Sequence, residues 1–291
     1  QHRGPDFWPQ AKAAYQQALH LIREFGNHYE ETDVLANLGS LYQTMGDSVR
    51  ALEQYSQAID LIESLRACVS SADARVGFFT TVVDTYTRVV QIHLEAGHAA
   101  QAFNTVERAR SRTFIELLAQ QAIRPSSQVS PALLQKEQEL RTELRQLYIT
   151  TAGQTERIRQ LEQQLDGVQQ AIRVLDAEYA DLQAVHPLTH EQVQERLPSN
   201  AVLLSYTSDT NGHFWALVVT QANIQATPIP NLSVRWLQGY LADHLDGMRR
   251  GSLVPDPQTG YLAPPHLLFS SLYNVLIKPV WKQLERIQTL Y

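Results

Sequence analysis

The residues best suited to metal or acid–base chemistry are the ten histidines, and one pair has the spacing of metal ligands. His186 and His190 lie four residues apart, a separation that places two imidazoles on one face of a helix. Pro187 between them disfavours a continuous helix through the pair, and no cysteine or carboxylate set completes a site. We therefore expect these histidines to pack at a helix end, and we expect no metal.

Nucleophilic catalysis has little support in the sequence. The single cysteine, Cys68, lies at the end of a predicted helix beside Arg66, and packing explains it. No serine occupies a Gly-x-Ser-x-Gly elbow, and no glycine-rich phosphate loop occurs. We expect no catalytic residue and no cofactor. A lone cysteine also excludes an internal disulfide and favours the reducing cytoplasm.

A further set of polar side chains has a spacing suited to recognition rather than to catalysis. Its members are Asp33, Asn37, Ser40, Gln43, Thr44, Asp84, Arg88 and Gln91. The first five lie in one predicted helix and the last three in another. Asn37 and Arg88 could hydrogen-bond an extended peptide backbone if both helices line one groove. The alternative is an ordinary solvated face.

The first third of the chain contains a repeat that would position these helices. Small and aromatic residues recur with the same offsets in three sets: Ala11-Tyr15-Ala18, Ala51-Tyr55-Ala58 and Ala102-Val106-Ala109. Together with Leu38-Gly39 and Tyr42, this pattern resembles the tetratricopeptide repeat. The spacings between sets, 40 and 51 residues, exceed the about 34 of the standard unit, so we expect extended repeats.

The repeat pattern predicts helices at about 9–25, 32–45, 48–65, 73–96 and 99–119, within a helical solenoid over 1–122. Gly39 is small so that two helices approach closely at Tyr55, and Gly46 and Gly97 suit left-handed helix ends. His93 takes the place of the repeat tyrosine. Such a solenoid would offer a concave surface to a protein or peptide partner.

Residues 130–185 carry a heptad-like apolar pattern. After a turn at 150–155, apolar residues recur three and four apart at Ile158, Leu161, Leu165, Val168, Ile172, Leu175, Tyr179 and Leu182. This predicts an antiparallel coiled-coil hairpin. It would serve as a structural arm or as a docking or dimerisation element.

The last hundred residues have the character of an α/β domain, over 190–291. Apolar strands at 201–206 and 213–220 flank an Asn211-Gly212 turn, and a third strand at 224–227 ends at Pro228. The strands are apolar at consecutive positions, so both faces should be covered. Helices are predicted at 233–249, 266–277 and 279–286, before a strand that starts at about 287.

Two segments add a resemblance. Residues 102–112, continuing through Glu116-Leu117-Leu118, are similar to the Glu-Arg-Ala-Lys-Ser-Arg hinge of bacterial CHAT-domain proteins, and Leu272–Pro279 matches a second family segment. In that family tetratricopeptide repeats precede a caspase- and separase-like cysteine peptidase domain. The resemblance implies the first layer of such a domain, because the family's catalytic histidine and cysteine map to no position in this sequence.

The expected fold is therefore mainly α: a tetratricopeptide solenoid, a helical hairpin and a partial caspase-like α/β domain. The expected function is the protein-interaction and regulatory portion of a CHAT peptidase, with a non-catalytic adaptor as the alternative. Besides a protein or peptide partner, the remainder of its own chain could complete the sheet. The formal charge of −6 argues against nucleic acid, and no apolar run is long enough for a membrane.

Overall fold

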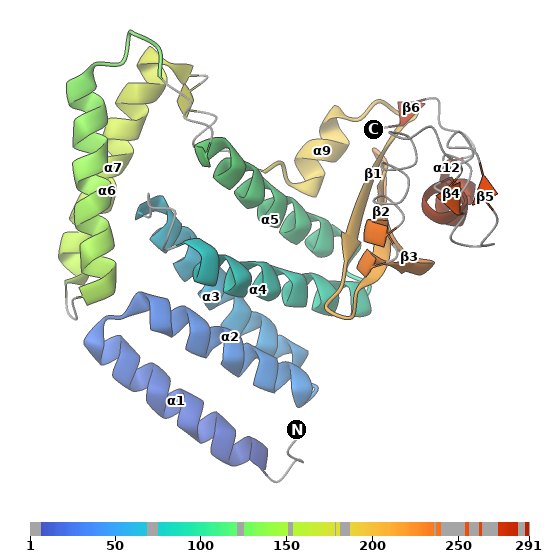
Figure 1. Cartoon of the computed structure of the whole chain (residues 1–291), viewed down its shortest axis with the longest axis horizontal. Coiled ribbons are helices and arrows are strands. Elements are labelled where there is room, and N and C mark those ends of the chain that lie inside the picture. The colour runs from blue at the N-terminus through green and yellow to red at the C-terminus, as the bar shows by residue number, and fades with distance from the viewer. Residues whose placement is uncertain are drawn as a thin grey trace. The chain divides into compact units, whose positions relative to one another are not determined.

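The computed structural model describes residues 7–68, 75–120, 125–150, 154–177, 179–180, 187–235, 237–239, 254–255, 262–263, 273–284 and 289–290. It is mainly α, with a small mixed sheet in the C-terminal part, as the sequence predicts (Figure 1). The chain forms two compact units, Gln1–Val89 with Arg108–His186 and Val90–Glu107 with Pro187–Tyr291. Helices α4 and α5 therefore contribute residues to both, and the three-domain division stays a prediction.

The predicted repeat helices are present. They are α1 (Trp8–Phe25), α2 (His28–Thr44), α3 (Ser48–Cys68), α4 (Arg75–Glu95) and α5 (Ala99–Gln120). Gly46 and Gly97 have φ angles of 80° and 73°, which confirms the left-handed turns after α2 and α4. Gly39 lies against Tyr55, and a Cβ atom on Gly39 would approach the Tyr55 ring to 2.7 Å.

A buried carboxylate fixes the turn between α1 and α2. Glu31 accepts hydrogen bonds from Arg23 Nε at 2.6 Å and pairs with His28 Nδ1 at 3.0 Å. Burial raises the pKa of Glu31, but its bonds to His28 and Arg23 outweigh that effect and lower it below the ordinary value. The helix before this turn ends at Gly26, whose φ of 70° is again left-handed.

The predicted hairpin is built from α6 (Pro131–Thr150) and α7 (Thr155–Leu175), which lie side by side (Figure 1). Its seam is a cluster that also includes Leu65 of α3, so the hairpin packs on the repeat helices of its own unit. The buried members are Leu65, Leu140, Leu144, Tyr148, Leu161 and Leu165.

The predicted apolar seam reaches Tyr179, which lies in one cluster with Val168 and Ile172, but the helix that carries it is interrupted. Helix α7 ends at Leu175 because Asp176 leaves helical geometry, with φ −151° and ψ 85°. Its carboxylate accepts the backbone N–H groups of Tyr179 and Ser126, which lowers the pKa of Asp176. An aspartate that satisfies two backbone donors in this way ends one helix and begins another. Leu182 lies outside the described residues.

A second polar cluster joins α3, α4 and α5 within the first unit. Tyr86 donates to Glu63 Oε1 at 2.7 Å, and Arg108 Nη2 donates to the same oxygen at 3.0 Å. Burial lowers the pKa of Arg108, but Glu63, Tyr86 and Asp60 together outweigh that effect and raise it. Arg108 belongs to the segment that resembles the CHAT hinge, and its contact is structural.

The sheet of the second unit has the strand order β3-β2-β1-β6. Strands β1 (Ala201–Ser208), β2 (His213–Val219) and β3 (Ile224–Ser233) are antiparallel neighbours, and β6 (Thr289–Leu290) pairs parallel to β1. The predicted hairpin turn is confirmed by Gly212, whose φ is 78°. A separate pair is formed by β4 (Val254–Pro255) and β5 (Leu262–Ala263).

Two predicted elements differ from the observed ones. The third strand does not end at Pro228 but continues through Pro230 to Ser233, which an edge strand tolerates because its outer N–H groups have no ladder partner. Of the helix predicted at 266–277, residues 266–272 lie outside the described residues and Tyr273–Ile277 form a π-helix. The helix predicted at 279–286 is preceded by a 3-10 turn (Lys278–Val280) and is α-helical over Trp281–Leu284, as α12. Most of the helix predicted at 233–249 lies outside the described residues.

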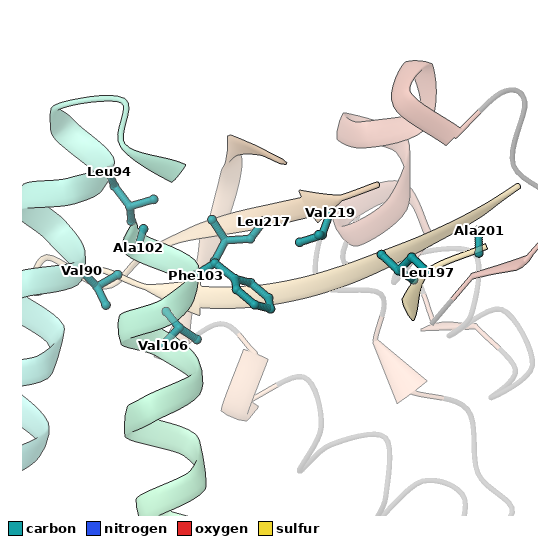
Figure 2. Packing of buried hydrophobic residues seen from close by; sticks show 9 residues of the cluster. All are labelled: Val90, Leu94, Ala102, Phe103, Val106, Leu197, Ala201, Leu217 and Val219. Carbon is teal, nitrogen blue, oxygen red and sulfur yellow. The ribbon is translucent and has the colours of Figure 1, made fainter. Parts of the chain in front are cut away.

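Both faces of the sheet are covered, as consecutive apolar positions predict. Phe103 packs on the face that carries Leu217 and Val219 (Figure 2). Ala216 and Val218, which alternate with them, face the other cluster. On β1, Tyr206 donates to the Leu276 carbonyl, and burial raises its pKa to about 12.

His93 should make the stability of this unit depend on pH. Burial and the neighbouring His98 lower the pKa of His93, and its Nδ1 atom is buried without a hydrogen-bond partner among the described residues. Because the folded state disfavours the protonated ring, stability is lost as pH falls below about 6.5, the ordinary histidine pKa. We expect the melting temperature of His93→Phe to fall less than that of the wild type between pH 7.5 and pH 5. Equal losses in a thermal melt at each pH would contradict this assignment.

Candidate partner-binding face

Five of the predicted recognition residues lie along α2. Asp33, Asn37 and Thr44 are exposed, whereas Ser40 and Gln43 are half-buried. The Asn37 amide makes no hydrogen bond among the described residues. The Thr44 hydroxyl donates to the Ser40 carbonyl at 2.8 Å, so it is satisfied within the helix.

Tyr55 of α3 connects the half-buried part of this set to α4. Its side chain is fully buried, and its hydroxyl donates to Gln43 Oε1 at 3.1 Å. Burial raises the pKa of Tyr55, while Arg88 and Ser40 beside the hydroxyl act in the opposite direction. Residues from both predicted recognition helices therefore meet at one hydroxyl group.

Asp84 and Arg88 form an ion pair within α4. Arg88 Nε donates to Asp84 Oδ2 at 2.7 Å. Burial lowers the pKa of Arg88, but Asp84 and Tyr55 together outweigh that effect and raise it. The side chains of Arg88 and Asp84 are 31% and 54% exposed, so a ligand could reach both. We define Asp33, Asn37, Ser40, Gln43, Thr44, Asp84 and Arg88 as the polar face.

Gln91 is not included in the polar face. It belongs to the second unit, where its amide donates to Glu95 at 2.7 Å and its oxygen accepts from the Thr210 hydroxyl. Thr210 is in the turn between β1 and β2. The repeat spacing alone does not reveal these partners, and the role of Gln91 in binding stays a prediction.

Tyr55 contacts the candidate face, whereas its place in the sequence predicts only a packing role. The repeat pattern places an aromatic residue there to fill space against Gly39, and it does so. The tyrosine hydroxyl could have indicated the contact, because a buried tyrosine O–H requires a hydrogen-bond partner. The polar residue Gln43 lies one helix turn after Gly39, against which Tyr55 packs.

The described residues contain no cluster of three or more histidine, cysteine or acidic side chains of the kind that holds a metal ion. His190 begins α9 (His190–Arg196), where its backbone N–H donates to Asn104 Oδ1 at 2.7 Å. His186 and the Cys68 side chain lie outside the description. None of the described helices is long and apolar enough to cross a membrane.

Comparison with known proteins identifies the N-terminal helices. No curated protein and no solved structure matches the chain. The family model described as tetratricopeptide repeat matches residues 6–64, which include α1, α2 and most of α3. The close approach at Gly39 and the left-handed Gly46 agree with that match. The chain is therefore a tetratricopeptide-repeat-containing protein, and such repeats indicate protein–protein interaction.

Proposed function

We propose that this chain binds a partner protein by taking an extended peptide segment of that partner on the polar face. One observation carries the proposal: Ser40 and Gln43 of α2 and Arg88 of α4 all meet at the buried Tyr55 hydroxyl. Because that group is fixed in the core, it holds the half-buried members of both helices in place. Preorganised polar groups lose less conformational entropy on binding than mobile ones.

The chemistry of the polar face favours a peptide backbone without strong negative charge. Its ionised groups are Asp33, Asp84 and Arg88, which sum to a formal charge of −1, and Arg88 is already paired with Asp84. The Asn37 amide offers both a donor and an acceptor, the combination that an extended backbone requires. A neutral or basic segment therefore fits better than an acidic one.

Asn37→Ala should weaken peptide binding without lowering stability. Peptides would first be selected from a random library on the full chain, and their affinities then measured by calorimetry. We expect Asn37→Ala and Asp84→Ala each to reduce affinity about fivefold or more, the loss of about one net hydrogen bond. The melting temperature of Asn37→Ala should barely change, because exposed polar sites usually alter stability by less than about 0.5 kcal/mol.

Glu53→Ala is the matched control, since Glu53 is an exposed residue of α3 outside the polar face. It should leave peptide affinity unchanged. Selected peptides that bind Asn37→Ala, Asp84→Ala and wild type equally well would exclude the polar face. The helical hairpin α6–α7 would then become the candidate surface.

A second candidate function comes from the sheet. The parallel pairing of β6 with β1, on the side away from β2, is a feature of mixed α/β sheets and is compatible with the first layer of a caspase-like domain. Together with the CHAT-like segments at 102–118 and 272–279, it supports a role as the interaction and regulatory portion of a CHAT peptidase. In this proposal the repeats and hairpin position the peptidase domain, and further residues of the same polypeptide could complete the sheet.

The two candidates predict different native gene products. For a CHAT peptidase, the native reading frame would encode strands that end in a histidine and a cysteine, and the purified gene product would cleave peptides. Loss of that cleavage on changing the cysteine to alanine would support the proposal. A gene product without these strands or that activity would leave the non-catalytic adaptor, cytoplasmic in our proposal, as the function.

A further inference from the structure

Helix α1 presents a large uncovered apolar surface. Only Leu19 of this 18-residue helix is buried, whereas Phe7 at its N-cap, Leu21 and Phe25 are 45%, 44% and 71% exposed. A surface stripe of large apolar side chains at regular spacing is unusual on a soluble helix and indicates a packing partner.

The spacing of these residues is that of a helix–helix seam. Apolar residues recur at alternating intervals of four and three, and we call them the α1 stripe: Phe7, Ala11, Ala14, Ala18, Leu21 and Phe25. This is the pattern of positions a and d in a coiled coil. The three central alanines would let a second helix approach closely, and the aromatic ends would close over it.

Some of the equivalent positions of the next repeat are packed, although Asp47 and Gln54 stand where the α1 stripe has Phe7 and Ala14. Forty residues along the chain, Ala58 on α3 corresponds to Ala18 and is fully buried. It lies in a cluster with Leu19 of α1 and Leu35 of α2. On α1, Ala11 and Ala18 are half-buried against their own unit, whereas Ala14, Leu21 and Phe25 are exposed and remain available to a second helix.

The stripe is also complementary to itself. Its intervals are symmetric about Gln16, so that in an antiparallel pair Phe7 lies opposite Phe25 of the second copy, and Ala14 opposite Ala18 of the second copy. We propose that two copies of this chain associate through antiparallel α1 helices. This is the isologous contact that a two-fold axis generates.

The residues flanking the stripe permit such a pair. Gln10, Gln17 and Glu24 lie along one flank at seven-residue intervals, and in the antiparallel register Gln10 comes near Glu24 of the second copy. No like charges meet there. The helix is about 27 Å long at 1.5 Å per residue, so the contact is small and the dimer should be a weak one.

Sedimentation and light scattering on the full chain test this proposal over a concentration series. We expect a monomer–dimer equilibrium for the wild type. Leu21→Glu with Phe25→Glu should raise the dissociation constant at least tenfold, and Ala14→Arg should do so independently at an exposed central position. Val49→Glu is the matched control, since Val49 is as exposed as Phe25 but lies on α3 and should leave the equilibrium unchanged.

Cysteine cross-linking tests the antiparallel register, in a Cys68→Ser background. In a mixture of Ala11→Cys and Leu21→Cys chains, the disulfide between the two different variants should form faster than the disulfide between two copies of either variant. A wild type that is monomeric at every concentration would overturn the proposal, as would a dimer insensitive to the α1 substitutions. The proposal would also be overturned if two Ala11→Cys chains formed a disulfide with each other faster than the mixed disulfide forms, because that result indicates a parallel pair.

Discussion

Phe103→Ala should lower the free energy of unfolding of the second unit by about 3–5 kcal/mol. Phe103 is 1% exposed and packs with Val106, Leu217 and Val219 between α5 and the sheet (Figure 2). Truncation removes the burial of an aromatic ring and leaves a cavity that a close-packed interior fills only partly. Urea titration followed by hydrogen exchange at the β2 amides measures the loss in this unit specifically.

Tyr273→Ala is the control for Phe103→Ala. Tyr273 is an aromatic residue of the same unit, but it is 42% exposed, and its truncation should cost far less. If the two variants were equally stable, Phe103 would not anchor α5 on the sheet. The segment 90–107 would then have no role in the core of the second unit.

Gly39→Ala should destabilise the first unit although alanine favours helix. The added methyl would come within 2.7–3.0 Å of three atoms of Tyr55, a ring that is fully buried and held by Gln43. Overpacking costs about 1–3 kcal/mol, and the gain in helix propensity is about 1 kcal/mol, so we expect a net loss of up to about 2 kcal/mol. Thermal and urea unfolding would both show it.

Gly167→Ala is the matched comparison for Gly39→Ala. Gly167 lies in the middle of α7, and a Cβ atom there would meet nothing within 4 Å. The same substitution should therefore stabilise the protein by up to about 1 kcal/mol. Pairing Gly39→Ala with Tyr55→Leu should cost less than the two losses added together, because the smaller side chain makes room for the methyl. Strict additivity would mean that the two residues do not compete for space.

The repeats and the strands could be predicted because their signals are local. Ala51, Tyr55 and Gly46 each follow from a spacing within one helical hairpin, and the model places them as expected. The apolar run 213–219 likewise predicts a strand covered on both faces, since consecutive side chains point to opposite sides. Short-range periodicity was sufficient for these elements.

The candidate site was less predictable because its contacts join residues far apart in the sequence. Spacing places Gln91 beside Arg88 on one helix, yet the partner of Gln91 is Thr210, 119 residues away. The meeting of Gln43 and Arg88 at Tyr55 depends on how three helices pack. The end of α7 at Asp176 depends in part on a bond to Ser126, 50 residues earlier. No single-helix pattern contains this information.

The two prolines of β3 make the two edges of the sheet unequal in their ability to pair with a further strand. Pro228 and Pro230 have no N–H to offer, so a strand from a neighbouring molecule that approaches along β3 meets a backbone that lacks two donors. At the β6 side, the Thr289 N–H donates to the Asn200 carbonyl at 3.2 Å, so among the described residues it is the N–H of Leu290 that faces outward. Amyloid-like addition of strands is therefore disfavoured at one end of the sheet, and any templating of that kind would proceed from the other end alone.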